Sequence, residues 1–386
     1  MICMQYLFLI SVLSILALSN YYVGQRGQQF LFLWSNPRSL MIYWGILVFL
    51  ASAYILGRIL EGRVPSLVSS FFFGLGSYWL AFLFYLVLFL WGMDLLRLTV
   101  GKTAFFQQSP LALGFIMPRL AVIAVLALVV FGTWNAWNTA VVHYNIHVPN
   151  QTTNLKEINI VMVSDLHLGT FINNWRLPPL VEHINRLKPD IVFLPGDVID
   201  VRLDALEEEQ LAAYLRRIES PYGVYAVLGN HEYLSGTAED IQAFHQKAGV
   251  KLLQDSWVEI PGGFYIVGRD EYSRKRWLNS PRRELEEVMH DIDHHLPIIL
   301  LDHQPVNLYE SLAAGVDLQV SGHSHRGQLK PLNLITAAIF EIDHGHLVKE
   351  DLQIIVSSGY GVWGPPIRIG SQSEIVSINL QFTPFE

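Results

Sequence analysis

The sequence predicts a layered α/β sandwich preceded by about four membrane-spanning helices. From residue 158 onward, short apolar runs of strand type alternate with helical patterns, as in α/β folds. Before residue 142 apolar side chains dominate, and the whole chain is 51% hydrophobic but only 16% charged, whereas soluble chains are about a quarter charged. We therefore expect a membrane anchor at 1–142, a linker at 143–157 and an α/β domain at 158–386.

Four apolar stretches precede the domain, and each approaches the roughly 20 residues that a membrane-spanning helix needs. Trp and Tyr recur near their ends, where amphipathic rings favour the headgroup region. Buried helices of a soluble protein are the alternative, and for the first stretch a cleaved signal peptide. That stretch begins without Lys or Arg, which disfavours a signal peptide. The four stretches are Met4–Tyr22, Leu40–Leu56, Leu67–Met93 and Leu120–Val142.

The distribution of basic residues predicts the orientation of these helices, because cytoplasmic loops carry an excess of Lys and Arg. The second loop offers Arg58 and Arg63, and after the last stretch no Lys or Arg occurs before Lys156. The first and third loops together carry more, namely Arg26 and Arg38 in the first and Arg97, Lys102 and Arg119 in the third. The α/β domain is therefore expected outside the cytoplasm.

Charge and cysteine content exclude two further possibilities. The net charge of -8 argues against a nucleic-acid partner, since binding to a phosphate backbone needs a basic surface. Cys3 is the single cysteine, so an intrachain disulfide is excluded. Absence of a disulfide does not decide the compartment, because a domain of this size can fold without one.

The elements of the α/β domain follow from hydrophobic pattern and length. Pro281 is expected in a first helical turn, where proline is well tolerated. The predicted helices are Pro178–Leu187, Leu203–Ile218, Ala238–Ala248 and Pro281–His290. The predicted strands are Ile158–Val163, Ile191–Leu194, Val224–Leu228, Phe264–Val267, Ile298–Leu301, Leu318–Val320, Ile354–Val356 and Ile375–Leu380.

Five of the predicted strands end directly in a short polar cluster. Ligands of open α/β sheets bind beyond the carboxyl ends of the strands, so these clusters should meet at one edge. Glycines at 196, 229 and 322 would let the backbone turn sharply there. The clusters are Ser164-Asp165-Leu166-His167, Gly196-Asp197, Gly229-Asn230-His231, Asp302-His303 and Gly322-His323-Ser324-His325.

The side chains of these clusters suit a centre of two divalent metal ions. Asp165 and His167 lie two residues apart, so on an extended strand end they share a face and can bind one ion together. Asp197 is a second carboxylate that can bridge two ions. Asn230 and His303 add an amide oxygen and an imidazole, and His323 with His325 repeats the two-apart spacing. This mixture of oxygen and nitrogen ligands suits Mn, Fe or Zn.

The ordered blocks resemble those of the calcineurin-like metallophosphoesterase superfamily, and the resemblance covers about residues 158–380. One block would be weak support, whereas five in order at strand ends are specific. The third block ends in Glu232 where Asp is commoner in the family. The blocks are Asp165-x-His167, Gly196-Asp197-x-x-Asp200, Gly229-Asn230-His231-Glu232, His303 and Gly322-His323-x-His325.

This resemblance implies an α/β/β/α order of layers and a role for each site residue. Asp165, His167 and His325 would hold the first metal, and Asp197 would bridge. The second metal would be held by Asn230, His303 and His323. His231 would contact the substrate phosphate and protonate the leaving oxygen. A water activated by the two ions would attack the phosphorus.

Four further residues are candidates for supporting roles, each with a plainer alternative. Asp200 is expected to orient a ligand histidine; otherwise it is a surface carboxylate. Arg326 could bind a phosphate oxygen through its planar guanidinium; otherwise it is solvated. Trp363 and Arg368 lie in a run of glycines and prolines that resembles a segment of membrane-attached bacterial relatives. They could face the substrate, or the run could merely cap the sheet.

The predicted function is hydrolysis of phosphodiesters or phosphomonoesters by a membrane-anchored enzyme with two metal ions. A lipid-linked substrate is a candidate because the domain is tethered beside a bilayer. One alternative is a scaffold that has lost its metals, against which the intact ligand set argues. Another is a transporter or receptor that binds a phosphate ligand, which the nearly uncharged apolar stretches disfavour.

Overall fold

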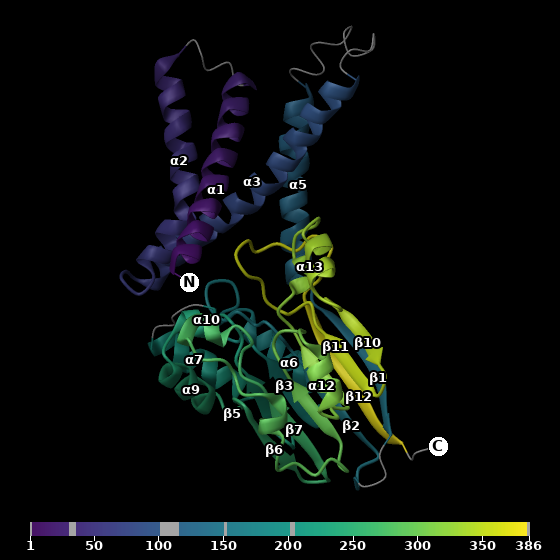
Figure 1. Ribbon diagram of the computed structural model, residues 1–386. Coiled ribbons are helices and arrows are strands. Elements are labelled where there is room, and N and C mark those ends of the chain that lie inside the picture. The colour runs from purple at the N-terminus through teal and green to yellow at the C-terminus, as the bar shows by residue number, and fades with distance from the viewer. Residues whose placement is uncertain (1, 31–35, 101–115, 150–152, 201–204, 384–386) are drawn as a thin grey trace. The chain divides into compact units, whose positions relative to one another are not determined.

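The computed structural model describes residues 2–30, 36–100, 116–149, 153–200 and 205–383 (Figure 1). The chain divides into two compact units. The membrane unit comprises Met1–Thr133 with Gly364–Pro366, and the α/β unit comprises Trp134–Trp363 with Ile367–Glu386. Each unit is described separately below.

The membrane unit is helical. Its helices are α1 (Ile2–Phe30), α2 (Pro37–Leu60), α3 (Ser66–Val100) and the greater part of α5 (Met117–Trp137). Among the described residues three helices are long and apolar enough to cross a membrane, whereas about four were predicted. These are α2, α3 to Thr99, and α5. Helix α1 covers the first predicted stretch, but side chains in its first turns lie outside the described residues.

Two contacts fix helices within the membrane unit. Asp94 of α3 pairs with Arg26 of α1 and accepts a hydrogen bond from Tyr22 Oη at 2.7 Å. Gly57 of α2 lies directly against α3, because a Cβ at this position would meet the Phe73 backbone nitrogen at 2.5 Å. Ion pairing and close backbone approach both stabilise helix contacts where lipid supplies no hydrophobic driving force.

The α/β unit contains two six-stranded sheets. The first has the order β1-β12-β2-β3-β4-β5, and its strands are β1 (Ala140–Pro149), β12 (Glu374–Thr383), β2 (Glu157–Met162), β3 (Ile191–Pro195), β4 (Val224–Val227) and β5 (Val250–Leu252). The second has the order β10-β11-β9-β8-β7-β6, with β10 (Gly345–Lys349), β11 (Leu352–Val356), β9 (Leu318–Ser321), β8 (Ile298–Leu301), β7 (Phe264–Gly268) and β6 (Ser256–Ile260). All eight predicted strands are present.

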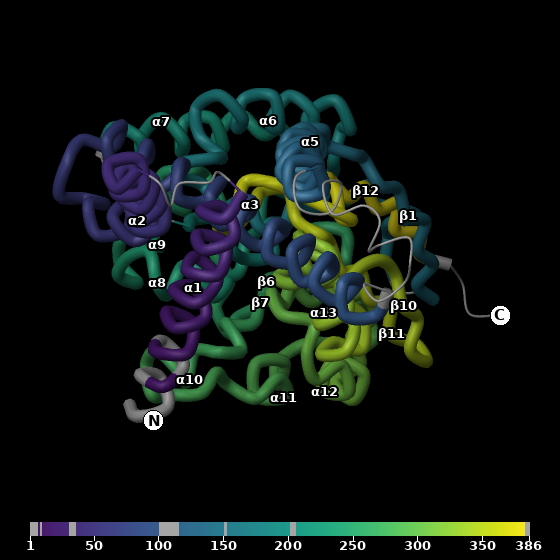
Figure 2. Tube along the Cα trace, turned by 90° about the horizontal axis from the view of Figure 1, so that it is seen from above, coloured from purple at the N-terminus to yellow at the C-terminus, as the bar shows by residue number. Residues whose placement is uncertain are grey.

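Helices cover the outer face of each sheet, so the α/β/β/α order of layers is confirmed. Figure 2 shows α6 and α7 on one side of the strands and α11 and α12 on the other. The longer helices are α6 (Leu177–Arg186), α7 (Ala205–Leu215) and α9 (Ala238–Lys247); short ones are α8 (Glu232–Ser235), α10 (Arg274–Leu278), α11 (Leu285–Val288), α12 (Leu308–Ala313) and α13 (Asn333–Ile339). Residues 203 and 204 of the predicted second helix lie outside the described residues.

Three apolar clusters fill the spaces between these layers. Phe193 of the first sheet and Ile299 of the second belong to the cluster between the sheets. Leu180 of α6 packs on the outer face of the first sheet, and Leu285 of α11 packs on that of the second. Because strands buried on both faces need apolar side chains throughout, their sequences read as continuous apolar runs.

Strand β1 corrects two predictions. The helix expected to reach Val142 ends at Trp137, and Ala140–Pro149 pairs in parallel with β12 over ten residues instead of forming a linker. Residues 150–152 of that linker lie outside the described residues. Ile146 and Val148 are buried while their neighbours are exposed, as expected for a strand with one covered face. The first residues of the strand are apolar and continue the hydrophobic run of the helix. The sequence therefore shows no sign of the boundary between α5 and β1.

The helix predicted over Pro281–His290 is also wrong for most of its length. Only Leu285–Val288 is helical, and Pro281 precedes it in a loop. The Arg282 guanidinium donates to both carboxylate oxygens of Asp302 at 2.9 Å, and this buried pair holds the segment against β8. A tertiary contact therefore overrides the local helical pattern.

Candidate metal centre

The polar clusters at the ends of β2, β3 and β9 are held by unusual backbone conformations, whereas those after β4 and β8 are not. Asp165, His167, Asp197, His323 and His325 all have φ between 48° and 70°. Non-glycine residues adopt this left-handed region infrequently, and such strain concentrates at functional sites. Five occurrences at the carboxyl ends of strands from both sheets indicate that the fold fixes the direction of these side chains at a cost in backbone energy.

Glycines at these strand ends allow neighbouring segments, within the first sheet and between the two sheets, to approach closely. A Cβ on Gly322 would lie 1.7 Å from Ser164 Oγ, and one on Gly229 would lie 2.2 Å from Asp197 Oδ1. Any side chain at either position would therefore displace a polar residue of the site.

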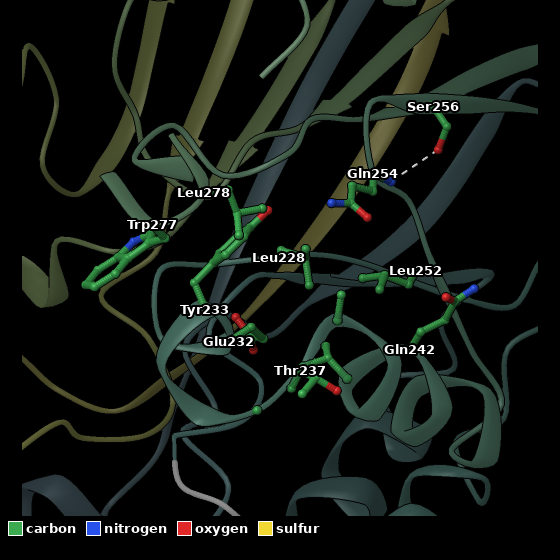
Figure 3. A pocket seen from close by; sticks show the side chains of 13 residues that line it. Leu228, Glu232, Tyr233, Thr237, Gln242, Leu252, Gln254, Ser256, Trp277 and Leu278 are labelled. Atoms are coloured by element: carbon green, nitrogen blue, oxygen red, sulfur yellow. Dashed lines mark hydrogen bonds between the residues drawn. The ribbon is translucent and has the colours of Figure 1, made fainter. Parts of the chain in front are cut away.

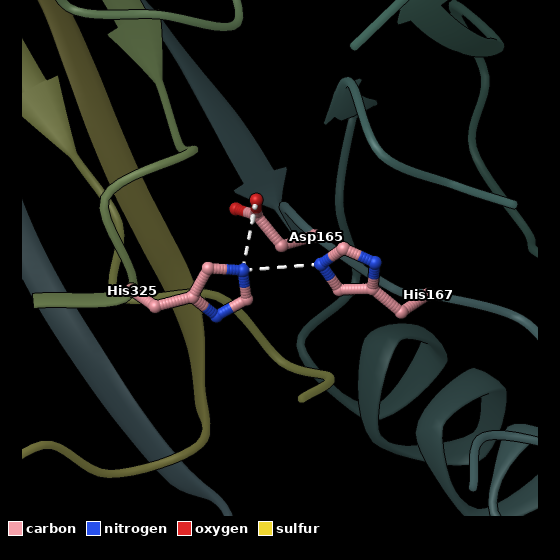
Figure 4. A group of neighbouring side chains, drawn as sticks. All are labelled: Asp165, His167 and His325. Atoms are coloured by element: carbon pink, nitrogen blue, oxygen red, sulfur yellow. Dashed lines mark hydrogen bonds and ion pairs between the residues drawn. The ribbon is translucent and has the colours of Figure 1, made fainter. Parts of the chain in front are cut away.

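The first group of converging side chains is Asp165, His167 and His325 (Figure 4). The two imidazole Nε2 atoms are 3.1 Å apart, and His325 Nε2 is 3.4 Å from Asp165 Oδ1. All three residues are buried. One carboxylate oxygen and two imidazole nitrogens at these distances can face a single ion.

The second group is Asp197, His303 and His323. His303 Nε2 lies 3.3 Å from Asp197 Oδ2 and 3.3 Å from His323 Nδ1. The other ring nitrogen of His303 is 2.9 Å from the carbonyl oxygen of Pro195, which fixes the ring. Such a contact to the remote nitrogen commonly orients histidines that bind metals.

Asp197 connects the two groups. Its Oδ2 is 3.9 Å from His167 Nε2 of the first group as well as 3.3 Å from His303 of the second. The neighbours of Asn230 both contact Asp197: Gly229 packs against it, and the His231 amide donates to its Oδ1 at 2.8 Å. The buried Oδ1 of Asn230 has no hydrogen-bond partner among the described residues. A buried amide oxygen without a hydrogen-bond partner is available to bind a cation.

His231 and Asp200 form a third group with His167. His231 Nδ1 is 2.5 Å from Asp200 Oδ1, and its Nε2 is 4.0 Å from Asp197 Oδ2, so this second nitrogen faces the centre. Asp200 Oδ1 is also 3.6 Å from His167 Nδ1. The carboxylate predicted to orient a histidine is thus buried beside two of them.

Comparison with known proteins agrees with this geometry. The sequence profile of the calcineurin-like phosphoesterase family matches residues 158–327. An uncharacterized metallophosphoesterase of Aquifex aeolicus is 36% identical over 229 residues, which cover 58% of this chain and 85% of that protein. The chain belongs to the calcineurin-like metallophosphoesterase family.

Two further relatives differ in how much of each chain is matched. An uncharacterized metallophosphoesterase of Campylobacter jejuni is 32% identical, and the match covers 61% of this chain and 62% of that protein. A zebrafish protein described as a transmembrane protein with metallophosphoesterase domain is 28% identical over 393 residues, 97% of this chain and 89% of that one. The similarity to the zebrafish protein therefore extends over the apolar helices.

The charges of this metallophosphoesterase site are set by burial and by the mixture of acids and imidazoles. Burial lowers the pKa of His323 to about 3 and that of His325 to about 4. Burial opposes ionisation of Asp165, but the neighbouring His325 holds its pKa below the usual range. His323 and His325 are therefore favoured as neutral imidazoles, the form that binds cations. Burial alone would lower the pKa of His303 as well, but the Asp197 carboxylate raises it well above the usual value. Burial would also lower the pKa of His231, but Asp197 and Asp200 together raise it to about 9.

Glu232 is a site residue whose role the sequence did not predict. It is buried, and its carboxylate accepts three backbone N–H groups, from Gly229 at 2.7 Å, Ile199 at 2.9 Å and Asp197 at 3.1 Å. It therefore ties the segment after β3 to the segment after β4. The sequence marked Glu232 only as a departure from the family pattern, because its partners are backbone atoms that no motif displays.

The remaining candidates lie in different surroundings. Arg368 is completely buried, and its Nη2 is 3.2 Å from His325 Nδ1, so it contacts the ring nitrogen of that histidine remote from Asp165 and His167. Trp363 is about half exposed, with its backbone bound to the Gln328 side chain. Arg326 is exposed and has a φ of 50°.

A cavity of about 490 Å³ lies beside this centre (Figure 3). Leu228, just before Gly229, and Glu232, just after His231, line it. Its other walls come from α9, the segment between β5 and β6, and α10, with Ile241, Leu252 and Leu278 among the apolar side chains. This volume is within the range of about 300–1,000 Å³ found for ligand pockets.

Proposed function

We propose that this protein is a membrane-anchored phosphoesterase that uses two divalent transition-metal ions. The observation that carries the proposal is the convergence of two ligand groups on Asp197, with the buried Asn230 oxygen beside them. Asp165, His167 and His325 would hold one ion, and His303, His323 and Asn230 the other. Asp197 would bridge them.

The side chains proposed as ligands suit metal ions that bind both nitrogen and oxygen. Imidazole nitrogens with carboxylate and amide oxygens suit Mn, Fe or Zn, whereas thiolate-bound metals would need cysteines and Ca would need more oxygen ligands. When bound, two such cations neutralise charge on the phosphate oxygens and lower the pKa of a water molecule between them.

The protein's own residues would supply the remaining chemistry. Asp200 holds Nδ1 of His231, so Nε2 faces the centre and can give a proton to the departing oxygen of the ester. Glu232 keeps the segments that carry Asp197 and Asn230 in place. Arg326, which is exposed, could meet a phosphate oxygen of an incoming substrate. These roles fit phosphodiesters and phosphomonoesters equally.

The cavity supports a substrate with an apolar part. Leu228, Ile241 and Leu252 line it together with Leu278 of α10, which is exposed. The cavity adjoins Glu232, the residue after the proposed acid His231, so a chain on the leaving group could lie there. A lipid-linked phosphate ester would match both this cavity and attachment to a bilayer.

The test is metal content and activity of the full chain purified in detergent. We expect about two transition-metal ions per chain and metal-dependent hydrolysis of bis-p-nitrophenyl phosphate, p-nitrophenyl phosphate or both. Asp197→Ala should abolish hydrolysis, and the exposed Asp291→Ala is the matched control. A chain that binds almost no metal would favour a silent scaffold or phosphate-binding protein, and full activity of Asp197→Ala would overturn the assignment.

A further inference from the structure

The last turn of α5 belongs to the same compact unit as the metal centre. Within this turn, Asn135 directs its side-chain amide at two backbone carbonyls, donating to Ser371 at 2.7 Å and to Arg368 at 3.0 Å. These carbonyls belong to residues more than 230 positions further along the chain. One amide thus joins the helix end to the segment that carries Arg368.

Arg176 makes a second connection to the same turn. Its guanidinium donates to the Ala136 carbonyl at 3.1 Å and lies 4.7 Å from the Trp137 ring and 5.1 Å from the Tyr360 ring. A cation is favourable at a helix C-terminus, where carbonyl groups lack partners in the helix. Tyr360 Oη donates to the Arg176 carbonyl at 3.2 Å, which closes the contact.

Arg368 leads from this helix end to the metal centre. Its Nη2 donates to the carbonyls of Gly361 at 2.6 Å and Gly359 at 3.0 Å, and lies 3.2 Å from His325 Nδ1. Its Nη1 is 3.2 Å from Ser371 Oγ. A completely buried guanidinium is costly unless its donors are used, so these contacts indicate a fixed position.

The glycine-rich segment, Ser358–Trp363, lies directly on the first ligand group. Tyr360 N–H donates to the Ser164 carbonyl at 2.9 Å, and Gly361 N–H donates to the Asp165 carbonyl at 2.8 Å. A Cβ on Gly359 would lie 2.9 Å from Asp165 Cβ. Arg368 therefore holds a segment that contacts Asp165 while it also contacts His325.

We propose that the last turn of α5 supports the metal centre, with Asn135 and Arg368 as positioning residues for Asp165 and His325. The part of this inference that concerns metal binding rests on the proposed function. Its consequence is that the helix predicted as an anchor also takes part in shaping the site. A displacement of its last turn would move the Arg368 and Ser371 carbonyls, and through them the glycine-rich segment.

Hydrogen exchange tests this connection without any metal. The measurement compares full-length wild type, Asn135→Asp and Gln372→Ala in detergent with a chelator. Asn135→Asp keeps the side-chain shape but replaces the donor with an oxygen facing two carbonyls. Gln372 bonds the Asn138 carbonyl at 3.0 Å nearby without touching Arg368, so it is the matched control. We expect about tenfold faster exchange in residues 358–363 for Asn135→Asp alone; unchanged exchange would overturn the proposal.

Metal titration supplies the second readout. Mn²⁺ binding is followed by the fraction of free ion in full-length protein, with Arg368→Lys added because lysine keeps the charge but loses the planar fork. Changes behind metal ligands typically weaken binding about 10–100-fold. We expect about tenfold weaker binding of one ion for both variants. Wild-type binding of two ions by both variants would overturn the inference alone, whereas a wild type without ions would count against the proposed function.

Discussion

Single residues of this site act mainly through one or two contacts, and Asn230 is the simplest case. Its buried Oδ1 lacks a partner among the described residues, so its replacement should remove a ligand without breaking another bond. For Asn230→Ala we expect about one ion per chain in place of two. We also expect kcat/KM to fall about 100-fold, since a missing metal contact costs several kcal/mol of transition-state stabilisation. Mass spectrometry of bound metal checks this; two retained ions would contradict it.

Glu232 acts through the backbone, so its loss should appear first as instability. Glu232→Gln places an NH2 group against N–H donors of Gly229, Ile199 or Asp197. Leaving a buried backbone N–H without its acceptor costs about 1–3 kcal/mol. We expect a lower melting temperature in chelator than for the exposed control Glu286→Gln. Equal melting of the two variants would mean that the segment after β3 does not depend on this carboxylate.

The sequence alone predicted the site residues whose side chains are typical metal ligands and which directly follow a strand. Asp165, His167 and His303 stand directly after apolar strand runs, so strand polarity alone predicts that they converge. The contact of Arg368 with His325 could not be predicted, because nothing in the local sequence pattern shows that this arginine is buried. The reason is physical: burial of the Arg368 guanidinium depends on distant carbonyls, at Gly359 and Gly361.

At the scale of elements, strands buried on both faces were predictable and strands at sheet edges were not. β5, β6 and β10 were missed because they are short or alternate between covered and exposed side chains. Such patterns compete poorly with loop and helix interpretations. β1 was missed for a different reason, since its first residues extend the apolar run of α5.

Strand β1 should contribute to folding of the α/β unit and not merely connect it. Ile146 is buried against the core between the sheets, so Ile146→Ala should destabilise the protein by about 2–5 kcal/mol. The neighbouring His147 is exposed, and His147→Ala should change stability by less than about 0.5 kcal/mol. Thermal melting of the full chain checks both. Equal melting of the two variants would restore the linker interpretation.

The junction between β8 and β9 should make stability depend on pH. Burial, with help from Asp351, raises the pKa of Asp317 from 3.8 to about 6, and its Oδ2 accepts the Ile298 N–H at 2.7 Å. A raised carboxyl pKa means that the fold favours the neutral acid. This contribution is therefore present below pH 4 and is lost as the pH rises through 6.

For wild type relative to Asp317→Asn, we expect a gain of about 2 kcal/mol between pH 7 and pH 4, from a shift of about two pKa units reduced for partial exposure. Unfolding of both chains in chelator at each pH measures the difference, which removes the effect of metal loss. The exposed Asp291→Asn serves as the control and should track wild type. A constant difference between wild type and Asp317→Asn at all pH values would contradict the assignment.

At the scale of the whole molecule, an apolar helical unit precedes an α/β unit whose site suits phosphate esters. The cavity beside Glu232 gives this combination a measurable consequence. If an apolar chain lies there, Leu278→Asp should reduce the preference for decyl over methyl p-nitrophenyl phosphate about tenfold. Val348→Asp, at the same exposed fraction of 54% but on β10, is the control. An unchanged ratio in Leu278→Asp would remove the cavity from substrate binding.

The same division of the chain makes the orientation of the α/β unit testable with one label. We propose that it lies outside the cytoplasm, because the predicted first and third loops together carry five Lys or Arg residues, whereas the second carries two and none follows the last apolar stretch before Lys156. In a Cys3→Ser background, Glu239→Cys places one thiol on an exposed position of α9. A membrane-impermeant maleimide should label it in intact spheroplasts, while Asn36→Cys, an exposed position directly before α2, should react only after permeabilisation. The opposite pattern would place the site in the cytoplasm, where a lipid-linked substrate would have to come from the inner leaflet.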